Sequence, residues 1–219
     1  MQRESTPHVA QRVRQGWTQS NAALERGTAF VNQIKTHMCG AFIAALAVCN
    51  RPRQSEYVLS HLAFRVPEWD QYVHVRTLLE RHAVANRENV WNGRPISLIV
   101  PAERIEVLDG KAVPLIELIP PVHQRVYRMG LEHLGVVVGD ELDEFSRAHR
   151  AVLTGQQFQS ANIDPVYVLF EDFTHVKFYR RSFFDVVEDE QGRFEGFTHV
   201  DGWVPQQLVT ATGPNPLPR

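Results

Sequence analysis

Cysteine is scarce in this sequence of 219 residues, with Cys39 and Cys49 as the only two. Two cysteines are too few for a disulfide framework, and their separation does not match the CxxC spacing that is typical of zinc sites. A reducing, cytoplasmic setting is therefore expected.

A surplus of basic charge is also lacking. The chain has 23 lysines and arginines against 25 aspartates and glutamates, which gives a net charge of -2. Because nucleic-acid binding depends on a concentrated basic surface, nucleic acid is not expected to be a partner.

No apolar run reaches the length of a membrane span. Residues 38–49 are almost wholly apolar, but a transmembrane helix needs roughly 20 such residues. Nearly forty residues precede this run, including Glu4 and Glu25, whereas a secretory leader begins with a short cationic stretch. We therefore expect a helix that is buried in protein, with no membrane partner.

One stretch occurs twice, and each copy places a histidine at the start of an apolar run. Residues 60–66 read Ser-His-Leu-Ala-Phe-Arg-Val, and residues 132–138 read Glu-His-Leu-Gly-Val-Val-Val. The two histidines, His61 and His133, lie 72 residues apart. A helical pattern and short strand-like runs follow each copy. Self-similarity at a fixed period indicates a duplicated module, and two histidines that meet at a pseudo-twofold axis would suit a metal.

The order of elements predicts a strand, a helix and three strands in each module. In module one these three strands are expected at 89–91, 95–100 and 112–119. The hairpin signal Asn92-Gly93 favours a tight turn between the first two, because a type I′ turn requires positive φ. The expected parts of the chain are a helical N-terminal extension at 1–56, module one at 57–121, module two at 122–190 and a partly ordered tail at 191–219.

These paired modules resemble the vicinal oxygen chelate superfamily, which includes glyoxalase I and the extradiol dioxygenases, and within it the YecM-type family. The segments that carry the resemblance are His61-Leu-Ala-Phe-Arg65, Asn92-Gly-Arg-Pro-Ile96, Ile116-Glu-Leu118, Glu132-His133 and Val176-Lys-Phe178. The resemblance implies an α+β fold in which paired βαβββ modules form one cupped mixed sheet. It also implies metal ligands on the first and last strands of each module.

The resemblance assigns ligand positions to three residues. His61 and His133 match the first strands, and Glu117 matches the last strand of module one. Lys177 falls where the superfamily usually has a fourth, acidic ligand. Two imidazoles and one carboxylate suit Fe²⁺, Zn²⁺ or Mn²⁺ with positions left open for water and substrate. Extradiol dioxygenases also use two histidines and one glutamate as ligands, but their glutamate lies in module two.

The surrounding charged residues each have two interpretations. Lys177 either pairs with Glu117 or Glu132, or it serves as a catalytic proton shuttle. Glu132 is either a partner of a ligand histidine or a catalytic base. Arg65 and Arg94 either bind an anionic substrate or form surface ion pairs.

The function expected from the resemblance is a metal-dependent enzyme. A divalent metal would chelate two vicinal oxygens of a small-molecule substrate, in a lyase, isomerase or oxygenase reaction. The alternative is a non-catalytic protein of the same fold that binds a metal or a small molecule. A protein-interaction role for the helical extension and a homodimer are also left open.

Overall fold

The computed structural model describes residues 57–203 except 109, 121–128 and 161. The expected helical extension, including the apolar run at 38–49, lies outside the described residues. No helix among the described residues is long and apolar enough to cross a membrane.

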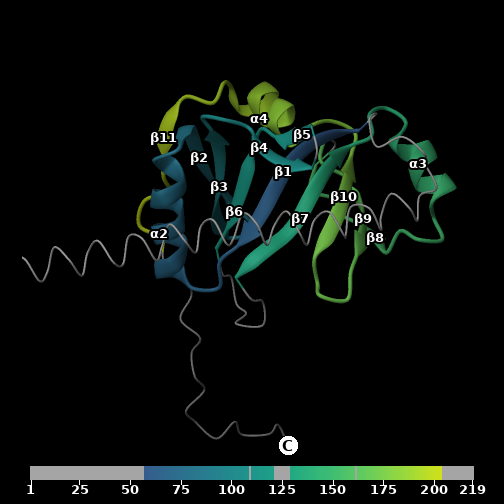
Figure 1. Cartoon of the computed structure of the whole chain (residues 1–219), viewed down its shortest axis with the longest axis horizontal. Coiled ribbons are helices and arrows are strands. Elements are labelled where there is room, and N and C mark those ends of the chain that lie inside the picture. Colours follow the sequence, from purple (N-terminus) through teal and green to yellow (C-terminus); the bar gives the residue numbers. More distant parts are fainter. Residues whose placement is uncertain (1–56, 109, 121–128, 161, 204–219) are drawn as a thin grey trace, which may run out of the picture.

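Module one contributes β1, α2, β2, β3 and β6, and a small β4–β5 hairpin lies between β3 and β6 (Figure 1). The bounds are β1 Val58–Arg65, α2 Trp69–Glu80, β2 Ala83–Trp91, β3 Arg94–Pro101, β4 Ile105–Leu108, β5 Lys111–Val113 and β6 Ile116–Ile119. Module two repeats the order. Its bounds are β7 Gly130–Val137, α3 Leu142–Ala148, β8 Gly155–Gln156, β9 Val166–Leu169 and β10 His175–Tyr179, and α4 Phe183–Gln191 and β11 Gly196–Thr198 follow.

The main strands form one mixed sheet in the order β11-β2-β3-β6-β1-β7-β10-β9-β8. In each module the first and last strands are parallel neighbours. The two first strands, β1 and β7, are antiparallel and join the modules at the centre of the sheet. The expected α+β fold of paired βαβββ modules is therefore confirmed.

The joint between β1 and β7 has nearly twofold symmetry. Leu62 lies opposite Leu134, and on either side His61 lies opposite Gly135 and Ala63 lies opposite His133. Since side chains alternate between the faces of a strand, His61 and Ala63 share one face, while Leu62 belongs to the other. We call the face that carries His61 the inner face.

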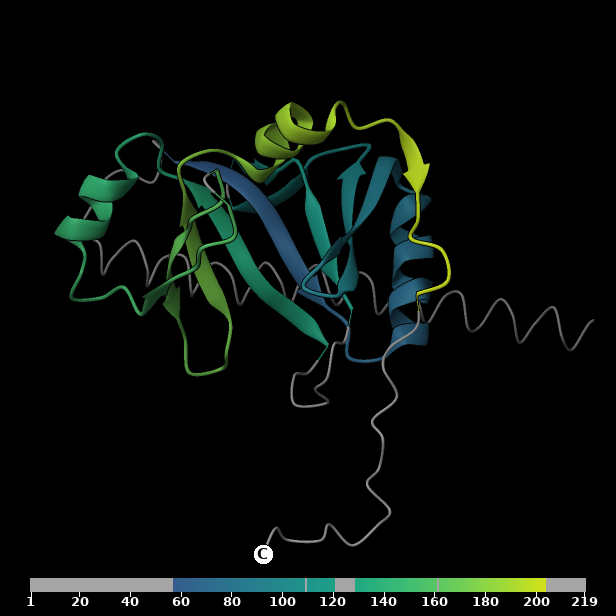
Figure 2. The same cartoon turned by 180° about the vertical axis from the view of Figure 1, so that it is seen from behind.

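Helices cover both faces of the sheet. On the outer face α2 packs through Tyr72 against Phe64 and Leu118, and α3 packs through Phe145 near Phe178. On the inner face α4 packs on module one. Its apolar residues Phe183, Val186 and Val187 join a core that includes Ala63, Leu98 and Leu115. The view from behind in Figure 2 shows α4 along one end of the sheet.

Two features of module one differ from the sequence prediction. The strand expected at 112–119 is split, because Lys111–Val113 pairs with β4 while Ile116–Ile119 joins the main sheet. Pro114 separates the two pieces, and proline cannot donate to a strand ladder. In addition, β2 begins at Ala83 and is longer than expected.

Two further elements, α4 and β11, follow β10 in the described chain. The helix α4 was not expected, although Ser182 caps its first turn by accepting a hydrogen bond from the Asp185 amide at 3.1 Å. The strand β11 pairs with β2 in parallel and so covers the edge of the sheet, where unpaired strands are prone to association. All three residues of β11 are exposed, so backbone pairing rather than burial positions the strand.

A buried carboxylate ties this segment to module one. Glu88 accepts hydrogen bonds from Tyr72 Oη at 2.5 Å, Arg76 at 2.7 Å, Ser97 at 3.1 Å and the Val200 amide at 2.7 Å. Burial alone would raise the pKa of Glu88, but the hydrogen bonds from Tyr72, Val200 and Arg76 hold it below its ordinary value. The four donors connect helix α2, strand β3 and the chain after β11.

We expect Glu88→Gln to lower the free energy of unfolding by about 2–4 kcal/mol at pH 7, because an amide cannot satisfy four donors and leaves Arg76 without its anion. Since the pKa of Glu88 is depressed on folding, the difference from the parent should shrink as the pH falls below the ordinary carboxyl range. Urea denaturation measures both effects. The exposed Glu106→Gln is the control, and equal losses in both variants would contradict a specific role for Glu88.

Candidate metal centre

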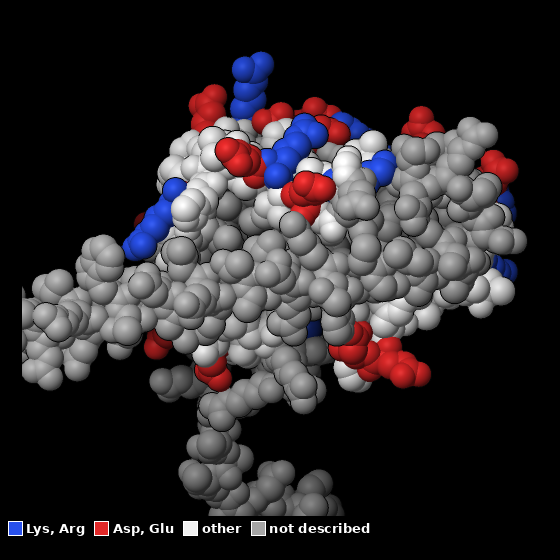
Figure 3. All heavy atoms as spheres, in the orientation of Figure 1, with Lys and Arg blue, Asp and Glu red and all other residues white. Residues whose placement is uncertain are grey.

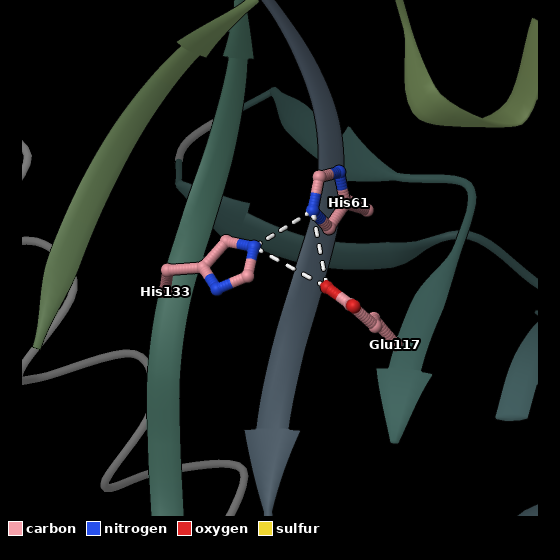
Figure 4. A group of neighbouring side chains, drawn as sticks. All are labelled: His61, Glu117 and His133. Atoms are coloured by element: carbon pink, nitrogen blue, oxygen red, sulfur yellow. Dashed lines mark hydrogen bonds and ion pairs between the residues drawn. The ribbon is translucent and has the colours of Figure 1, made fainter. Parts of the chain in front are cut away.

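Three side chains from three neighbouring strands converge on the inner face of the sheet (Figure 4). His61 Nε2 lies 2.9 Å from His133 Nε2 and 3.6 Å from Glu117 Oε2, and His133 Nε2 lies 3.3 Å from the same oxygen. Ligand atoms bound about 2.1 Å from one ion are separated by roughly 3.0–3.4 Å in octahedral or tetrahedral shells. The triangle therefore has the size and the donor types of a divalent-metal site.

Strand register explains this convergence. Glu117 lies opposite Ala63 on β1, and its side chain passes beside the small alanine toward His61. Gly135 lies opposite His61 on β7. A Cβ atom at Gly135 would come within 2.6 Å of the Cε1 and Nδ1 atoms of His61. The absence of a side chain at position 135 is therefore what lets the imidazole lie across the joint.

Burial keeps both histidines neutral, which is the form that binds metals. The exposed fractions of His61 and His133 are 0% and 2%. Burial, and then the positive charge of Lys177, lowers the pKa of His133 to about 4. The pKa of His61 is lowered well below its ordinary value by burial and by the neighbouring His133 and Lys177.

Glu117 is held in an environment that disfavours its negative charge. Burial raises its pKa to about 7, despite the opposing attraction of Lys177. A cation between this carboxylate and the two imidazoles would reverse the shift by stabilising the ionised form. The residues present thus fit a divalent ion chemically as well as geometrically.

Glu132 lies beside the centre rather than in it. Its Oε1 atom forms an ion pair with Arg65 at 2.8 Å, and its Oε2 atom lies 3.7 Å from His133 Nδ1. Burial alone would raise its pKa, but His133, Lys177 and Arg65 hold the pKa well below the ordinary value. Glu132 is therefore an anion that faces the back of one metal-site imidazole.

Lys177 occupies the position in module two that Glu117 occupies in module one. Glu117 lies opposite Ala63, two residues after the first histidine, and Lys177 lies opposite Gly135, two residues after the second. Its side chain is 8% exposed and donates a hydrogen bond to Gln157 Oε1 at 3.1 Å. Among the described residues no carboxylate lies within ion-pair distance of Lys177, so the expected pair with Glu117 or Glu132 is not formed.

The two arginines lie at the side of the site where β1, β3 and β6 meet. Arg65 is half of the ion pair with Glu132. Arg94 donates to the Pro120 carbonyl at 3.3 Å, and its buried Nε atom has no hydrogen-bond partner. Burial lowers the pKa of Arg94, while the nearby Glu132 acts in the opposite direction.

Among the neighbours of the site, Ser60, Phe183 and His175 were not singled out from the sequence. The His61 ring packs against Tyr179 at 5.3 Å and Phe183 at 5.0 Å between ring centroids, and its Nδ1 atom lies 2.9 Å from Ser60 Oγ. His175, two residues before Lys177, has a buried Nδ1 atom without a hydrogen-bond partner. Two sequence signals could have identified them. His175 is two residues before Lys177, so strand alternation places it on the inner face, and Ser60 occupies the position before His61 that Glu132 occupies before His133.

Comparisons with known proteins agree with this architecture. The single mixed sheet of two βαβββ modules is the fold that the resemblance to the vicinal oxygen chelate superfamily predicts. A family model described as YecM protein matches residues 29–177, and the chain belongs to this family. No curated protein matches the chain.

Among solved structures, a structural-genomics protein described as Protein EC4020 is 21% identical, with a TM-score of 0.54, over 73% of this chain and 92% of its own. Methylmalonyl-CoA epimerase from Mycobacterium tuberculosis is 17% identical, with a TM-score of 0.40, over 60% of this chain and 93% of its own. A methylmalonyl-CoA epimerase from Streptomyces coelicolor, in complex with 2-nitronate-propionyl-CoA, is 10% identical, with a TM-score of 0.39, over 55% and 94%.

The raised pKa of Glu117 predicts how the metal-free protein responds to pH. A carboxyl whose pKa rises on folding destabilises the native state as the pH increases from the unfolded value toward about 7. We expect metal-free Glu117→Gln to be more stable than the parent by about 3 kcal/mol at pH 8, and by about 1 kcal/mol or less near pH 5. Urea denaturation in the presence of a chelator measures this difference.

The parent and the Glu117→Gln variant both keep His61 and His133. The lowered pKa values of these histidines reduce stability only as the pH falls below the ordinary histidine value. Because this loss is common to the parent and the variant, it cancels in their comparison. Adding Zn²⁺ at pH 8 should stabilise the parent selectively. A difference that is the same at pH 5 and pH 8 would contradict the assigned pKa of Glu117.

Proposed function

We propose that this chain is a divalent-metal-dependent enzyme of the vicinal oxygen chelate type, acting on a small anionic substrate with two adjacent oxygens. The observation that carries the proposal is the convergence of His61 Nε2, His133 Nε2 and Glu117 Oε2 on one point of the inner face. Three protein ligands would leave coordination positions for the substrate, as in other catalytic metal sites.

The three converging side chains would hold Fe²⁺, Zn²⁺ or Mn²⁺. When bound, such an ion supplies Lewis-acid chemistry that stabilises negative charge on a substrate oxygen. The neutral imidazoles and the carboxylate together contribute one negative charge, so a divalent ion keeps a net positive charge in the site. That residual charge favours an anionic oxygen over a neutral one.

The cationic side chains around the centre favour a negatively charged substrate. Lys177, Arg65 and Arg94 outnumber the carboxylates Glu117 and Glu132. Arg65 and Glu132 neutralise one another through their ion pair, which leaves Lys177 and Arg94 as the groups that would face substrate charge. An arginine suits a carboxylate through its paired N–H donors.

Lys177 would act as a donor rather than as a ligand. A protonated ammonium has three N–H donors and no lone pair, so it cannot bind the ion. Gln157 holds one of these donors, and the others would interact with an anionic substrate oxygen. In this position Lys177 would move a proton to or from the substrate.

Glu132 suits a positioning role better than that of a base. One of its oxygens is engaged by Arg65 and the other faces His133. Its strongly lowered pKa makes it a weak proton acceptor. Its negative charge would instead favour a proton on His133 Nδ1 and leave Nε2 free for the ion.

A non-catalytic protein that binds a metal or a small molecule is the second candidate. The observation that favours it is the position of α4, whose Phe183 packs on His61 and occupies the inner face at module one. A site enclosed in this way could retain a ligand without converting it. Stoichiometric binding with no turnover of any oxygen-chelating carboxylate would support this candidate.

Metal content after anaerobic purification tests the proposed function. We expect about one divalent ion per chain in the parent and a loss of stoichiometric binding in His133→Ala, because two ligands rarely retain an ion that three can hold. The exposed His74→Ala is the matched control and should keep its metal. A parent chain that neither contains nor takes up Fe²⁺, Zn²⁺ or Mn²⁺ would overturn the proposal.

The position of Lys177 predicts that two substitutions change metal affinity by different amounts. Lys177→Glu should complete a four-ligand site and tighten Zn²⁺ binding by about tenfold or more, because it adds a carboxylate and removes a repelling charge. Lys177→Met should bind Zn²⁺ at least as tightly as the parent, yet impair turnover. Competitive chelator titration measures the affinities, with circular dichroism to verify folding. A folded Lys177→Glu variant that binds no more tightly than Lys177→Met would place Lys177 outside the coordination shell.

A further inference from the structure

Two cationic side chains flank the candidate metal centre on the inner face of the sheet. The three ligand strands β6, β1 and β7 lie side by side, with β3 next to β6 and β10 next to β7. Lys177 on β10 lies opposite Gly135 on the inner face. Leu98 on β3 lies opposite Glu117, and strand alternation places Arg94 on the same face as Leu98. One cation therefore lies on each side of the centre.

Neither cation has a carboxylate within ion-pair distance among the residues that the structure describes. Lys177 is 8% exposed and donates to a neutral amide oxygen. Arg94 donates to the Pro120 carbonyl at 3.3 Å, which is also a neutral acceptor. Arg65, by contrast, is paired with Glu132 at 2.8 Å. Because a desolvated charge without a counter-ion is costly, Lys177 and Arg94 favour an anionic ligand.

The two cations lie at different distances from the ligand atoms. Lys177 is on the strand next to His133, and its positive charge acts on the pKa values of both Glu117 and His133. The Arg94 guanidinium lies beside the carbonyl of Pro120, three residues beyond Glu117, which is roughly 10 Å along an extended strand. Lys177 is therefore placed to contact the oxygens that would bind an ion, whereas Arg94 is placed to contact the far end of a ligand.

A second arginine lies at the same end of the inner face as Arg94. Arg65 on β1 lies opposite Ile119 on β6, the residue before Pro120. Burial lowers the pKa of Arg94, the nearby Glu132 raises it, and the like charge of Arg65 lowers it further. Two guanidinium groups thus share one carboxylate at this end, and a second carboxylate would pair the remaining cation.

The charge of a filled centre also favours a ligand with two negative charges. Arg65 and Glu132 neutralise one another. The positive charges of a divalent ion, Lys177 and Arg94 would then outweigh the single negative charge of Glu117. A monocarboxylate would offset only part of this excess in a largely buried region, whereas a dicarboxylate would bring the site closer to neutrality.

We propose that the substrate is a small dicarboxylate and that Arg94 is the residue that recognises its second carboxylate. The first carboxylate and the oxygen next to it would bind the ion beside Lys177. The second would accept from the N–H donors of Arg94 that Pro120 leaves unused. The separation of the two ends corresponds to a chain of about four to six carbons. This inference rests on the proposed metal centre and narrows the class of its substrate.

Three pairs of 2-hydroxy acids test this substrate class with the metal bound. Each pair has one chain length and one chelating hydroxyl and carboxylate, and only one member has a second carboxylate. The pairs are malate with 2-hydroxybutyrate, 2-hydroxyglutarate with 2-hydroxyvalerate, and 2-hydroxyadipate with 2-hydroxyhexanoate. Titration calorimetry of the Zn²⁺-loaded full chain measures the affinities, and zinc content is verified afterwards. We expect the dicarboxylate of at least one pair to bind about 10–100-fold more tightly than its partner.

Substitutions of the two cations separate their roles. Arg94→Met should abolish the preference for the dicarboxylate and leave the affinity for the monocarboxylate unchanged, because it removes only the distal contact. Arg94→Lys keeps the charge without the planar fork and should retain part of the preference. Lys177→Met should weaken the binding of both members of a pair. The exposed Arg104→Met is the matched control and should bind both members as the parent does.

The outcomes distinguish this inference from the metal centre on which it rests. No preference in any of the three pairs, absence of binding included, would overturn the dicarboxylate proposal in a chain that holds Zn²⁺. A preference that persists in folded Arg94→Met would overturn the role of Arg94. Failure of the parent to bind Zn²⁺ would overturn the proposed function itself. If Arg94→Met does not fold, the comparison of the parent with Arg94→Lys decides the role of Arg94.

Discussion

The antiparallel pairing of β1 with β7 is the constraint on which the rest of the structure depends. It joins the strands of module one to those of module two through Leu62 and Leu134 and so brings His61 and His133 to the same face. Strand alternation then requires small residues at the positions beside them, which are Ala63 and Gly135. A slip of one residue would turn both histidines into the outer core, where α2 and α3 pack.

The duplicated frame carries an unequal distribution of charge. In module one the last strand supplies the anionic Glu117, and the neutral Ser60 is the extra residue of a β-bulge where β1 pairs with β7. In module two the last strand supplies the cationic Lys177 and the bulge supplies the anionic Glu132. The carboxylate of module one thus lies in front of the imidazoles, whereas the carboxylate of module two lies behind one of them. In the proposed site it would position His133 and leave the front open to a charged substrate.

Much of the fold could be predicted because the duplicated segments can be recognised in the sequence itself. The two His-Leu-small repeats lie on strands at equivalent places, and alternation alone assigns their faces. The family match begins at residue 29, whereas the described residues begin at residue 57. The helical extension and the module boundaries therefore stay predictions.

The missed features depend on pairing that local sequence does not specify. The bulges at Ser60 and Glu132 exist only in the register of β1 against β7, so Ser60 looked like an ordinary strand residue. The strand β11 is fully exposed and held by its backbone, which leaves no hydrophobic pattern to detect. By contrast, α4 had a readable signal in the Ser182 cap and in the helical spacing of Phe183, Val186 and Val187.

Charge at the surface differs from charge at the centre. The face shown in Figure 3 carries lysines, arginines and acidic residues interspersed, without a large area of one sign over the described atoms. The concentrated charges are instead the buried or partly buried groups around β1, β6, β7 and β10. Placing Glu117 among them without a cation costs stability, as its raised pKa shows.

That cost links stability to binding. A ligand that binds only the native state stabilises it in proportion to its affinity, and a cation at the centre would also remove the penalty on Glu117. Ser60 and Glu132 lie behind the imidazoles, with Ser60 Oγ 2.9 Å from His61 Nδ1 and Glu132 Oε2 3.7 Å from His133 Nδ1. An ion in the proposed site would therefore couple metal binding to the stability of the fold.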